Sequence, residues 1–474
     1  MKANRTKIIA TIGPATSSKE MLNKLIDAGM NVCRLNFSHG SHTDHQQVID
    51  NIKELNNEKN TSVALLADLG GPKLRIGEIE NGEVEIENGS ELVFTTKECV
   101  GNHQKVWMSY AEFAKDVKAG EQILIDDGKL ILEVVSTNSK DEVVAKVIHG
   151  GTLKSKKGVN LPNTYVSLPC LTEKDLRDLE FALENEVSWV ALSFVRSASD
   201  IIELKHLISM KGKQARVIAK IEKPEAVRDI DEILRETDAV MVARGDLGVE
   251  IPMQNVPLIQ KNIVKRCLDF AKPVIVATQM MESMITNITP TRAEVNDVAN
   301  AVMDGADAVM LSGETSVGKF PIAVVENMYK IINNVESYEG IFHVDHELDS
   351  TKPRFVSDAV CDNACKMARS VNAAAIITMT FSGYTAFKVS SYRPKAMVYV
   401  FTSNRSILNM LSLIWGVKGV YYDKFVSTDH TIDDIKFILR KKGYVKEKDL
   451  VVNIASIPIA EKGMSNMLKL SMID

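Results

Sequence analysis

The sequence predicts an α/β protein with a TIM (β/α)8 barrel, an inserted small β-barrel lid domain and a C-terminal open α/β domain. Three observations predict this fold. Eight short apolar runs alternate with helical patterns over the first two thirds of the chain. The third of these units is interrupted by a long stretch rich in hairpin signals. After a weakly periodic linker, strands and helices alternate again to the end of the chain.

Length and composition exclude several classes of protein. A chain of 474 residues is long enough for about three domains. The net charge of −5 implies no nucleic-acid partner. Six scattered cysteines without a CxxC pair favour a reducing cytosol. Because Met1 leads straight into a predicted strand, with no signal peptide or apolar span, we expect a cytoplasmic protein without a membrane partner.

The predicted barrel strands are separated by helices with clear start and stop signals. Ser17–Glu20, Thr172–Asp175 and Thr291–Glu294 each pair a hydroxyl with a nearby acid, which favours a helix start. Gly29 and Gly305 favour helix ends. The eight strands are predicted at Lys7–Gly13, Asn31–Phe37, Ser62–Asp68, Trp189–Phe194, Arg216–Glu222, Ala239–Ala243, Pro273–Thr278 and Ala308–Leu311.

The stretch 216–250 carries the main candidate site, because two of its predicted strands end in charge. Lys220 and Glu222 share one face of the first strand, and Arg244 and Asp246 follow the second. Parallel βα units place a site at the carboxyl ends of their strands. Ordinary surface charge is the alternative, but these residues continue buried-looking apolar runs. The pattern therefore indicates a site for a divalent metal and an anion.

Polar residues recur at the same end of the other predicted strands. Any one of them alone would be typical of a turn, whereas their recurrence is typical of the active site at the top of a barrel. They are Arg34, Asn36, Ser38, Asp68, Arg196, Thr278, Ser312 and Glu314.

The insertion and the C-terminal region complete the predicted domains. We expect the barrel at 1–72 and 170–338, the lid at 73–169 and the C-terminal domain at 339–474. In the insertion, hairpin signals stand at Asn81-Gly82, Asn88-Gly89 and Asp127-Gly128. The basic loop 155–158 suits phosphate contact, although such loops are usually just solvated.

The predicted C-terminal domain contains a candidate effector loop. Its helices and strands alternate as 356–371, 374–380, 384–391, 396–401, 405–414, 419–422, 432–442 and 450–455. The loop Thr380–Thr385 combines hydroxyls with a glycine at a helix start, which suits an anion. A simple capped turn is an equally good interpretation.

From these residues alone we infer a metal-assisted enzyme acting on a small anionic substrate beneath a lid. In addition, eight sequence blocks resemble the motifs of the pyruvate kinase family. The order and spacing of the motifs match from Thr6 to the end of the chain. The blocks are MNVCRLNFSHG (30–40), DLGGPKLR (68–75), SKKGVNLP (155–162), VIAKIEKPEA (217–226), MVARGDLGVEIP (241–252), VATQMMESMI (276–285), TRAEVNDVANAV (291–302) and MLSGET (310–315).

The resemblance implies phosphoryl transfer from phosphoenolpyruvate to ADP, giving pyruvate and ATP in the last step of glycolysis. By the family's motifs, Glu222 and Asp246 hold Mg²⁺, for which Mn²⁺ can substitute. Lys220 and Arg34 face the transferring phosphoryl group. The backbone amides of Gly245 and Asp246, together with the Thr278 side chain, receive the substrate carboxylate.

The resemblance also implies two steps and a nucleotide site. Phosphoryl transfer leaves an enolate, which is then protonated near Thr278 and Ser312, and neither hydroxyl is assigned as the sole acid. A second Mg²⁺ arrives with ADP. The residues that match the family's nucleotide contacts are Asn36, His39, Arg75, Asp127 and Lys157.

One block departs from the pattern of family members that require K⁺. Where those members have D-T-K-G-P-E, this sequence has Leu69, Gly70 and Lys73 at the second, third and sixth positions. The Lys73 ammonium can supply the charge that K⁺ supplies elsewhere, so we expect K⁺ not to be required. A lysine that only points to solvent at the hinge is the alternative. The family's K⁺ ligands correspond to Asn36, Ser38, Asp68 and the Leu69 carbonyl.

Regulation, assembly and rival functions are expected as follows. Phe381 stands where fructose-1,6-bisphosphate-activated members often have Lys, so Thr380, Ser382 and Thr385 are expected to hold at most one phosphate of an effector. The resemblance implies a homotetramer.

The rivals are a barrel lyase or aldolase without a nucleotide, and a catalytically inactive metabolite sensor. ADP-dependent pyruvate formation distinguishes both from a pyruvate kinase.

Overall fold

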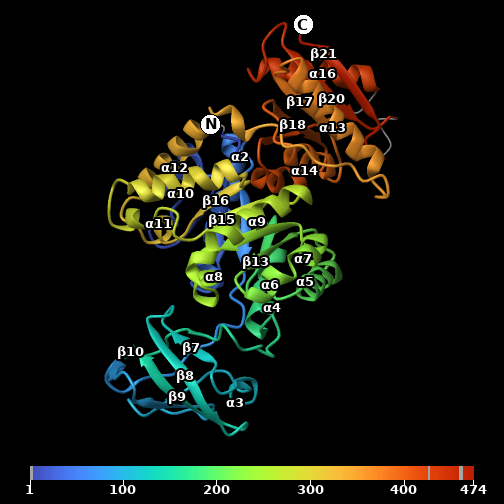
Figure 1. The fold of residues 1–474 in the computed structure, drawn as a ribbon. Helices are drawn as coiled ribbons and strands as arrows, with labels where there is room; N and C mark the ends of the chain where they lie inside the picture. The colour runs from blue at the N-terminus through green and yellow to red at the C-terminus, as the bar shows by residue number, and fades with distance from the viewer. Residues whose placement is uncertain (1–3, 425–426, 458–462) are drawn as a thin grey trace.

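The computed structural model describes residues 4–424, 427–457 and 463–474. Its three regions follow one another along the long axis of the molecule (Figure 1). The lid lies at one end, the TIM barrel in the middle and the C-terminal α/β region at the other end. The closed barrel, the β-sheets of the lid and the C-terminal α/β sheet confirm the predicted fold class.

The central barrel closes through eight parallel strands in the order β1-β16-β15-β14-β13-β12-β3-β2. All eight predicted strands are present, and six of them are one or two residues shorter than predicted, at the start, at the end or at both ends. Their bounds are β1 Lys7–Thr11, β2 Val32–Asn36, β3 Ala64–Asp68, β12 Trp189–Leu192, β13 Arg216–Ile221, β14 Ala239–Ala243, β15 Val274–Ala277 and β16 Ala308–Leu311.

The helices around the barrel begin and end at the predicted signals. The Ser18 hydroxyl accepts a hydrogen bond from Met21 N, and Thr172 and Thr291 form full capping boxes. Gly29 ends its helix with φ 129°. The helices are α1 Lys19–Ala28, α2 His42–Lys59, α4 Glu173–Glu184, α5 Ala198–Met210, α6 Pro224–Arg228, α7 Ile230–Glu236, α8 Arg244–Glu250, α9 Val256–Asp269, α10 Arg292–Asp304, α11 Gly313–Ser316 and α12 Pro321–Val335, with short 3₁₀ turns at Met253–Asn255 (η2) and Glu282–Ile285 (η3).

Alternation along each strand divides the barrel core into two layers. Ile9, Leu66 and Ile218 belong to the group of buried residues that fills the barrel, whereas Ile8 and Val217 belong to the layer between the strands and the helices. Apolar side chains thus fill the barrel interior, and the polar residues are left at the strand ends.

The lid is a six-stranded curled sheet, in the order β11-β7-β8-β9-β5-β6, beside a two-stranded sheet β10-β4. Of the three predicted hairpin turns, only Asp127-Gly128 joins two strands that pair, β7 and β8. The turns at Asn81-Gly82 and Asn88-Gly89 are not hairpins, because β4 crosses to pair with β10 instead of with a neighbour in sequence. The lid elements are η1 Glu80–Gly82, β4 Glu83–Ile86, β5 Glu91–Thr95, β6 Lys105–Trp107, α3 Phe113–Asp116, β7 Gln122–Ile125, β8 Leu130–Thr137, β9 Glu142–His149, β10 Gly151–Lys154 and β11 Val159–Asn160.

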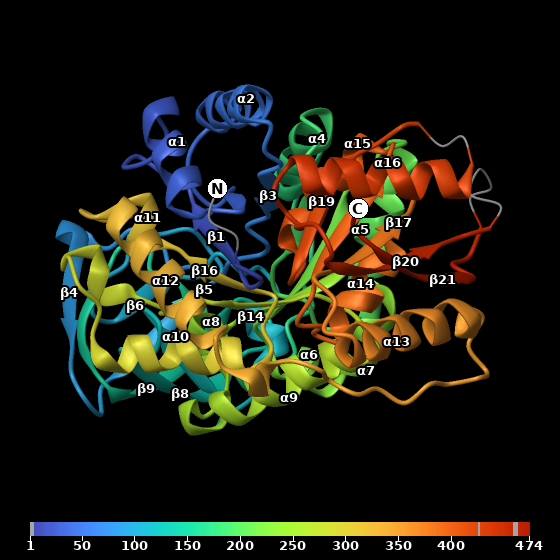
Figure 2. The same cartoon turned by 90° about the horizontal axis from the view of Figure 1, so that it is seen from above.

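The C-terminal region is a five-stranded sheet in the order β19-β18-β17-β20-β21. Helices α13 and α16 lie on opposite faces of this sheet (Figure 2). The predicted elements are present, and the antiparallel edge strand β21 is an addition to them. The bounds are η4 Glu339–Ile341, α13 Phe355–Ser370, β17 Ala375–Met379, α14 Tyr384–Ser391, β18 Met397–Thr402, α15 Arg405–Met410, η5 Leu411–Leu413, β19 Val417–Tyr421, α16 Thr428–Lys441, β20 Leu450–Ala455 and β21 Met467–Met472.

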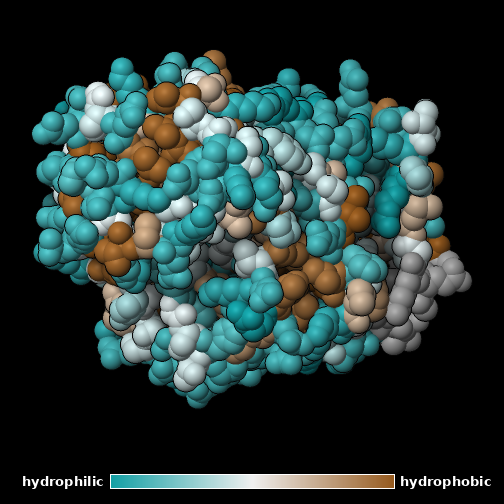
Figure 3. Space-filling view, turned by 90° about the horizontal axis from the view of Figure 1, so that it is seen from below, coloured by the Kyte–Doolittle hydropathy of each residue, from teal (hydrophilic) through white to brown (hydrophobic). Residues whose placement is uncertain are grey.

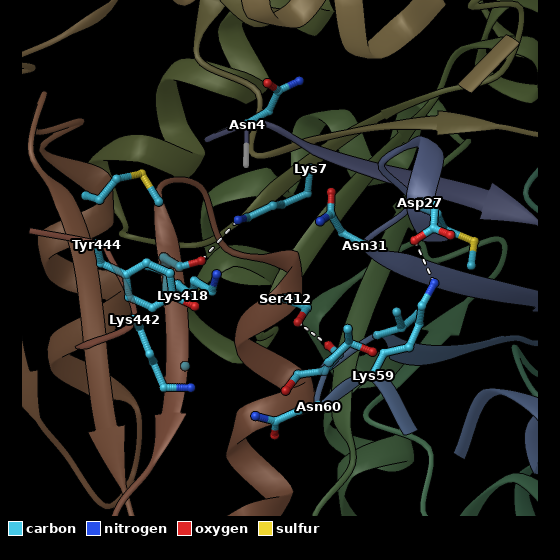
Figure 4. Close-up of a pocket in the computed structure, with 17 residues that line it drawn as sticks. Asn4, Lys7, Asp27, Asn31, Lys59, Asn60, Ser412, Lys418, Lys442 and Tyr444 are labelled. Atoms are coloured by element: carbon cyan, nitrogen blue, oxygen red, sulfur yellow. Dashed lines mark hydrogen bonds and ion pairs between the residues drawn. The ribbon is translucent and has the colours of Figure 1, made fainter. Parts of the chain in front are cut away.

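The amino-terminal end of the barrel packs against the C-terminal region. A buried ion pair joins Arg393 to Asp307 at 2.8 Å, and Trp189 Nε1 donates to the Met410 carbonyl. A cavity of about 390 Å³, shown in Figure 4, is lined by residues of both regions. Lys7 of β1 lines it and donates from Nζ to the Val417 carbonyl of β19 at 3.0 Å.

The face at the lid end of the molecule is mostly hydrophilic, with small separate hydrophobic patches (Figure 3). Among the described residues, we find no helix with the length and hydropathy needed to cross a membrane.

Candidate active site

The charged residues predicted at 216–250 lie at the carboxyl ends of the barrel strands, on the side of the lid. Lys220 of β13 is at most one-tenth exposed. Its ammonium lies 2.9 Å from Glu222 Oε1 and 3.2 Å from Asp68 Oδ1, and it donates to Ser193 Oγ at 2.7 Å. Burial by itself lowers the pKa of Lys220, but Asp68, Glu222 and Asp246 outweigh burial and raise it. Lys220 is therefore a fixed positive charge.

Arg34 lies beside this lysine and is held in one orientation. Its Nε and Nη2 both lie 2.7 Å from Asp68 Oδ2, and Nη1 donates to Thr11 Oγ1 at 2.8 Å. Burial raises the pKa of Asp68, but Lys220 and Arg34 overcome that effect and lower it. One carboxylate thus holds two cations at the strand ends, where they can meet an anionic substrate.

Glu222 is a second buried carboxylate of the site, beside Asp68. Its Oε2 accepts a hydrogen bond from Phe194 N at 2.7 Å. Burial raises the pKa of Glu222, Lys220 lowers it, and the nearby Asp246 raises it further, with a net upward shift. Two carboxylates that repel each other in this way are stabilised by a cation between them.

The two carboxylates suit a metal ion that also takes oxygen atoms from a substrate. Among the described residues, no group of three or more His, Cys, Asp or Glu side chains is placed to hold a metal. Mg²⁺ usually binds one or two protein carboxylates and completes its shell with water and phosphate oxygens. Glu222 and Asp246 fit this pattern.

Thr278 and Gly245 form a strained corner between the end of β15 and the start of α8. Thr278 follows β15 with φ 67°, a conformation that costs a β-branched residue on the order of 1–3 kcal/mol. It is held there because Arg244 Nη2 donates to its carbonyl at 2.8 Å. Gly245 N donates to Thr278 Oγ1 at 2.7 Å, and a Cβ at Gly245 would lie 3.3 Å from that oxygen. The corner thus presents an amide and a hydroxyl side by side.

Ser312 lies at the end of β16, apart from these contacts. Its backbone N donates to Glu314 Oε2 at 2.7 Å, and Met281 N donates to Glu314 Oε1. Burial raises the pKa of Glu314. No contact of the Ser312 hydroxyl with Lys220 is present among the described residues.

The predicted nucleotide residues divide between the lid and the barrel. Arg75, Asp127 and Lys157 lie together on the lid, where Arg75 Nη1 donates to the Lys156 carbonyl and Lys157 pairs with Asp126 at 2.8 Å. A small cavity of about 40 Å³ separates this part of the lid from the barrel. Its lining includes Lys73, Asp127, Asn160, Arg196, Lys223 and Asp246.

On the barrel side, Asn36 is the last residue of β2 and His39 belongs to the loop after it. The Asn36 carboxamide oxygen accepts from Ser38 N at 3.1 Å, and His39 is exposed. The Leu69 carbonyl, predicted as a K⁺ ligand, accepts a hydrogen bond from Ser193 Oγ at 2.7 Å. Lys73 is exposed at the hinge, and its Cε lies 3.6 Å from the place of a Cβ at Gly158.

Two residues of the site were not predicted. Ser193 bridges Lys220 to the Leu69 carbonyl, and Thr11 anchors Arg34. Ser193 is within a predicted strand, and Thr11 looks like any residue of a buried strand. Their only signal in the sequence is a hydroxyl at the end of an apolar run.

The candidate effector loop is closed mainly by its own hydroxyls. Thr380 Oγ1 accepts from Gly383 N at 3.1 Å, and the Ser382 hydroxyl from Tyr384 N at 3.4 Å. The Thr385 hydroxyl is buried against Ser465 at 3.0 Å.

Comparison with known proteins decides the family. Residues 3–325 match the family model for the pyruvate kinase barrel domain, and residues 358–471 match that for the pyruvate kinase alpha/beta domain. The chain belongs to the pyruvate kinase family. It is 44% identical to the pyruvate kinase of Geobacillus stearothermophilus, over 99% of this chain and 80% of that protein. It is 42% identical to the pyruvate kinase of Clostridium perfringens, over 99% and 100%.

A solved structure agrees with these sequence matches. The crystal structure of a pyruvate kinase from Cryptosporidium parvum superposes with a TM-score of 0.93 at 36% identity, over 99% of this chain and 96% of that one. The enzyme is therefore a pyruvate kinase that uses a divalent metal and transfers the phosphoryl group of phosphoenolpyruvate to ADP.

Proposed function

We propose that the strand-end residues of β2, β13 and β15 and the start of α8 carry the pyruvate kinase reaction in the roles predicted from the sequence. The observation that carries the proposal is the Lys220 ammonium between Asp68 and Glu222, next to the Arg34 guanidinium. Two fixed cations, held by Asp68, and the carboxylates of Glu222 and Asp246 within one site match a trianionic substrate together with its metal ion.

Binding of phosphoenolpyruvate uses both sides of the site. Glu222 and Asp246 hold Mg²⁺ or Mn²⁺, which neutralises phosphate and carboxylate oxygens when bound. Gly245 N and Thr278 Oγ1 are hydrogen-bonded to each other at 2.7 Å. When the substrate binds, both groups can instead donate to one oxygen of its carboxylate. Arg34 and Lys220 then contact the phosphoryl group.

The reaction follows in two steps. In the first, Lys220 stabilises the charge that develops as the phosphoryl group leaves the enolate oxygen for ADP. In the second, the enolate takes a proton at its methylene carbon, from the side to which the family's motifs assign Thr278 and Ser312. Asn36 and His39 on the barrel, and Arg75, Asp127 and Lys157 on the lid, hold ADP. Closure of the lid excludes water that would hydrolyse the phosphoryl group.

The enzyme works without K⁺. Lys73 stands at the hinge between barrel and lid and lines the cavity that also contains Asp127 and Asp246. A tethered ammonium at this position supplies charge near the substrate and nucleotide phosphates without a mobile cation. Without K⁺, the residues that match the family's K⁺ site stabilise the fold and the contact with Arg34. These residues are Asn36, Ser38, Asp68 and Leu69.

The remaining proposals concern the whole assembly. We propose the domain limits 1–72 with 170–338, 73–169 and 339–474, a homotetramer and a cytoplasmic location. A phosphorylated effector with one phosphate binds at Thr380, Ser382 and Thr385. The chemistry of Phe381, which offers no cation, supports a monophosphate over a bisphosphate.

The residue roles are tested by a lactate dehydrogenase-coupled assay with phosphoenolpyruvate, ADP and Mg²⁺. We expect Lys220→Met to lower kcat by about a thousandfold or more with a small change in the KM for phosphoenolpyruvate, because its charge acts in the transition state. Glu222→Ala is expected to lose turnover and the response to Mg²⁺. A Lys220→Met enzyme with near-normal kcat contradicts the proposed role. Pyruvate formation that does not need ADP contradicts the reaction itself.

A further inference from the structure

A buried carboxylate connects the lid to the barrel helix that begins with the substrate site. Glu250 is the last residue of α8, and its side chain is 1% exposed. Its Oε1 accepts from Asn160 Nδ2 of the lid strand β11 and from Lys223 Nζ of the barrel, each at 2.7 Å. Its Oε2 has no hydrogen-bond partner among the residues that the structure describes. A buried charge of this kind is retained only by the partners that neutralise it.

The positions of these three residues connect the two halves of the active site. Glu250 follows Asp246 by four residues, which places both side chains on one face of α8. Lys223 directly follows Glu222. The two barrel residues of the contact are thus tied to the two proposed metal carboxylates by the backbone.

On the lid side, Asn160 is tied to the proposed nucleotide residues. Strand β11 pairs with β7, with Asn160 opposite Leu124 and Val159 opposite Ile125. Lys157 precedes β11 and Asp127 follows β7, so the position of Asn160 sets the position of both. In the described part of the chain, the other side-chain hydrogen bond between lid and barrel is that of Arg196 Nη1 with the Val166 carbonyl, at the second hinge.

We propose that Asn160, Glu250 and Lys223 form a latch that positions the lid over the barrel and thereby sets the affinity for ADP. All three are positioning residues, because they act on the nucleotide through Asp127 and Lys157. Lys223 balances the Glu250 charge, which leaves the Asn160 amide to fix the angle of the lid. The proposal rests on the nucleotide roles given above.

The decisive experiment exchanges the two partners without changing their shapes. Asn160→Asp sets two carboxylates against each other, and Glu250→Gln removes the charge that holds Lys223. We expect each change to raise the KM for ADP by about tenfold or more, the effect of losing one charged hydrogen bond. The KM for phosphoenolpyruvate is expected to stay within about twofold, because the barrel side of the site is intact.

The double variant Asn160→Asp with Glu250→Gln again pairs one carboxylate with one amide, with the two groups exchanged between the positions. The glutamine amide donates to the new aspartate, and Lys223 again has one carboxylate nearby. We expect the KM for ADP to return to within about threefold of the wild-type value, a non-additivity that a merely structural role would not produce. Hydrogen exchange of the β11 amides is expected to rise in both single variants and to recover in the double variant.

Two matched variants separate this proposal from the nucleotide assignment. Asn163→Asp makes the same change at an exposed lid residue and is expected to leave both KM values unchanged. Lys157→Met tests the nucleotide role directly, and if it leaves the KM for ADP unchanged, that role is wrong. The proposed latch is wrong if the effects of the two single variants on the KM for ADP simply add in the double variant. It is also wrong if the single variants change the KM for ADP and the KM for phosphoenolpyruvate equally.

Discussion

At the scale of the residue, the proposed independence from K⁺ rests on Lys73. We expect wild-type turnover in K⁺-free buffer with a bulky organic counter-ion to equal that with K⁺, because the ammonium is already tethered to the hinge. Lys73→Glu is expected to lose about tenfold or more of its turnover without K⁺ and to recover when K⁺ is added. Lys73→Arg keeps the charge and serves as the control. A wild-type enzyme that is silent until K⁺ is added contradicts the proposal.

The same scale shows what the sequence could reveal of the site. Lys220 and Asp246 were recognisable because a charge at the end of a buried strand has few other uses. Ser193 was not recognisable, because a hydroxyl at that point is equally suited to a turn. No pattern in the sequence singled out Glu250, because its contact is with a lid residue 90 positions away in the chain. Partners that come from distant elements leave no local pattern.

At the scale of the element, the proposed monophosphate effector depends on the loop before α14. A second phosphate needs a second cation, and Phe381 stands where a lysine could provide it. We expect a sugar monophosphate or AMP to lower the KM for phosphoenolpyruvate severalfold, and fructose-1,6-bisphosphate at millimolar concentration to have little effect. Phe381→Lys is expected to gain a response to the bisphosphate. Strong activation of the wild type by the bisphosphate alone is the result that contradicts this effector class.

Elements were predictable where local chemistry determined them, and less so where pairing did. The helix starts at Ser18, Thr172 and Thr291 all contain their own hydrogen-bonding groups. The turn at Asn88-Gly89 carries a hairpin signal, yet β4 pairs with β10 and not with β5. The edge strand β21 was missed because its position depends on β20, its only neighbour in the sheet. Strand order is a property of the whole sheet, which local turn residues only partly determine.

At the scale of the whole molecule, the barrel and the C-terminal region meet around a buried cation. Lys7 is almost fully buried beside the cavity of Figure 4. Burial lowers the pKa of Lys7 to about 8, Glu336 and Asp307 oppose this shift, and Lys418 and Arg5 add to it. The Lys7 ammonium thus lies at this junction with a carbonyl as its hydrogen-bond partner.

The sign of the resulting pH dependence follows from linkage. Between pH 8 and the unfolded value of about 10.4, Lys7 is neutral in the folded protein and still charged in the unfolded chain. The unfolded state then binds more protons, so the contribution of Lys7 to the free energy of unfolding rises with pH across this window. Below pH 8 the lysine is charged in both states, and the cost of burying that charge is fully present.

Urea unfolding of the wild type and of Lys7→Met at about pH 7.5 and pH 9.5 measures this effect. We expect the free energy of unfolding of the wild type, relative to Lys7→Met, to increase by on the order of 2 kcal/mol between the two pH values. Comparing the two proteins at each pH removes the titration of the groups they share. Lys140→Met, at an exposed turn of the lid, is expected to show no such change. A difference that stays constant or shrinks as pH rises means that Lys7 keeps an ordinary pKa, and that the junction holds it as a solvated cation.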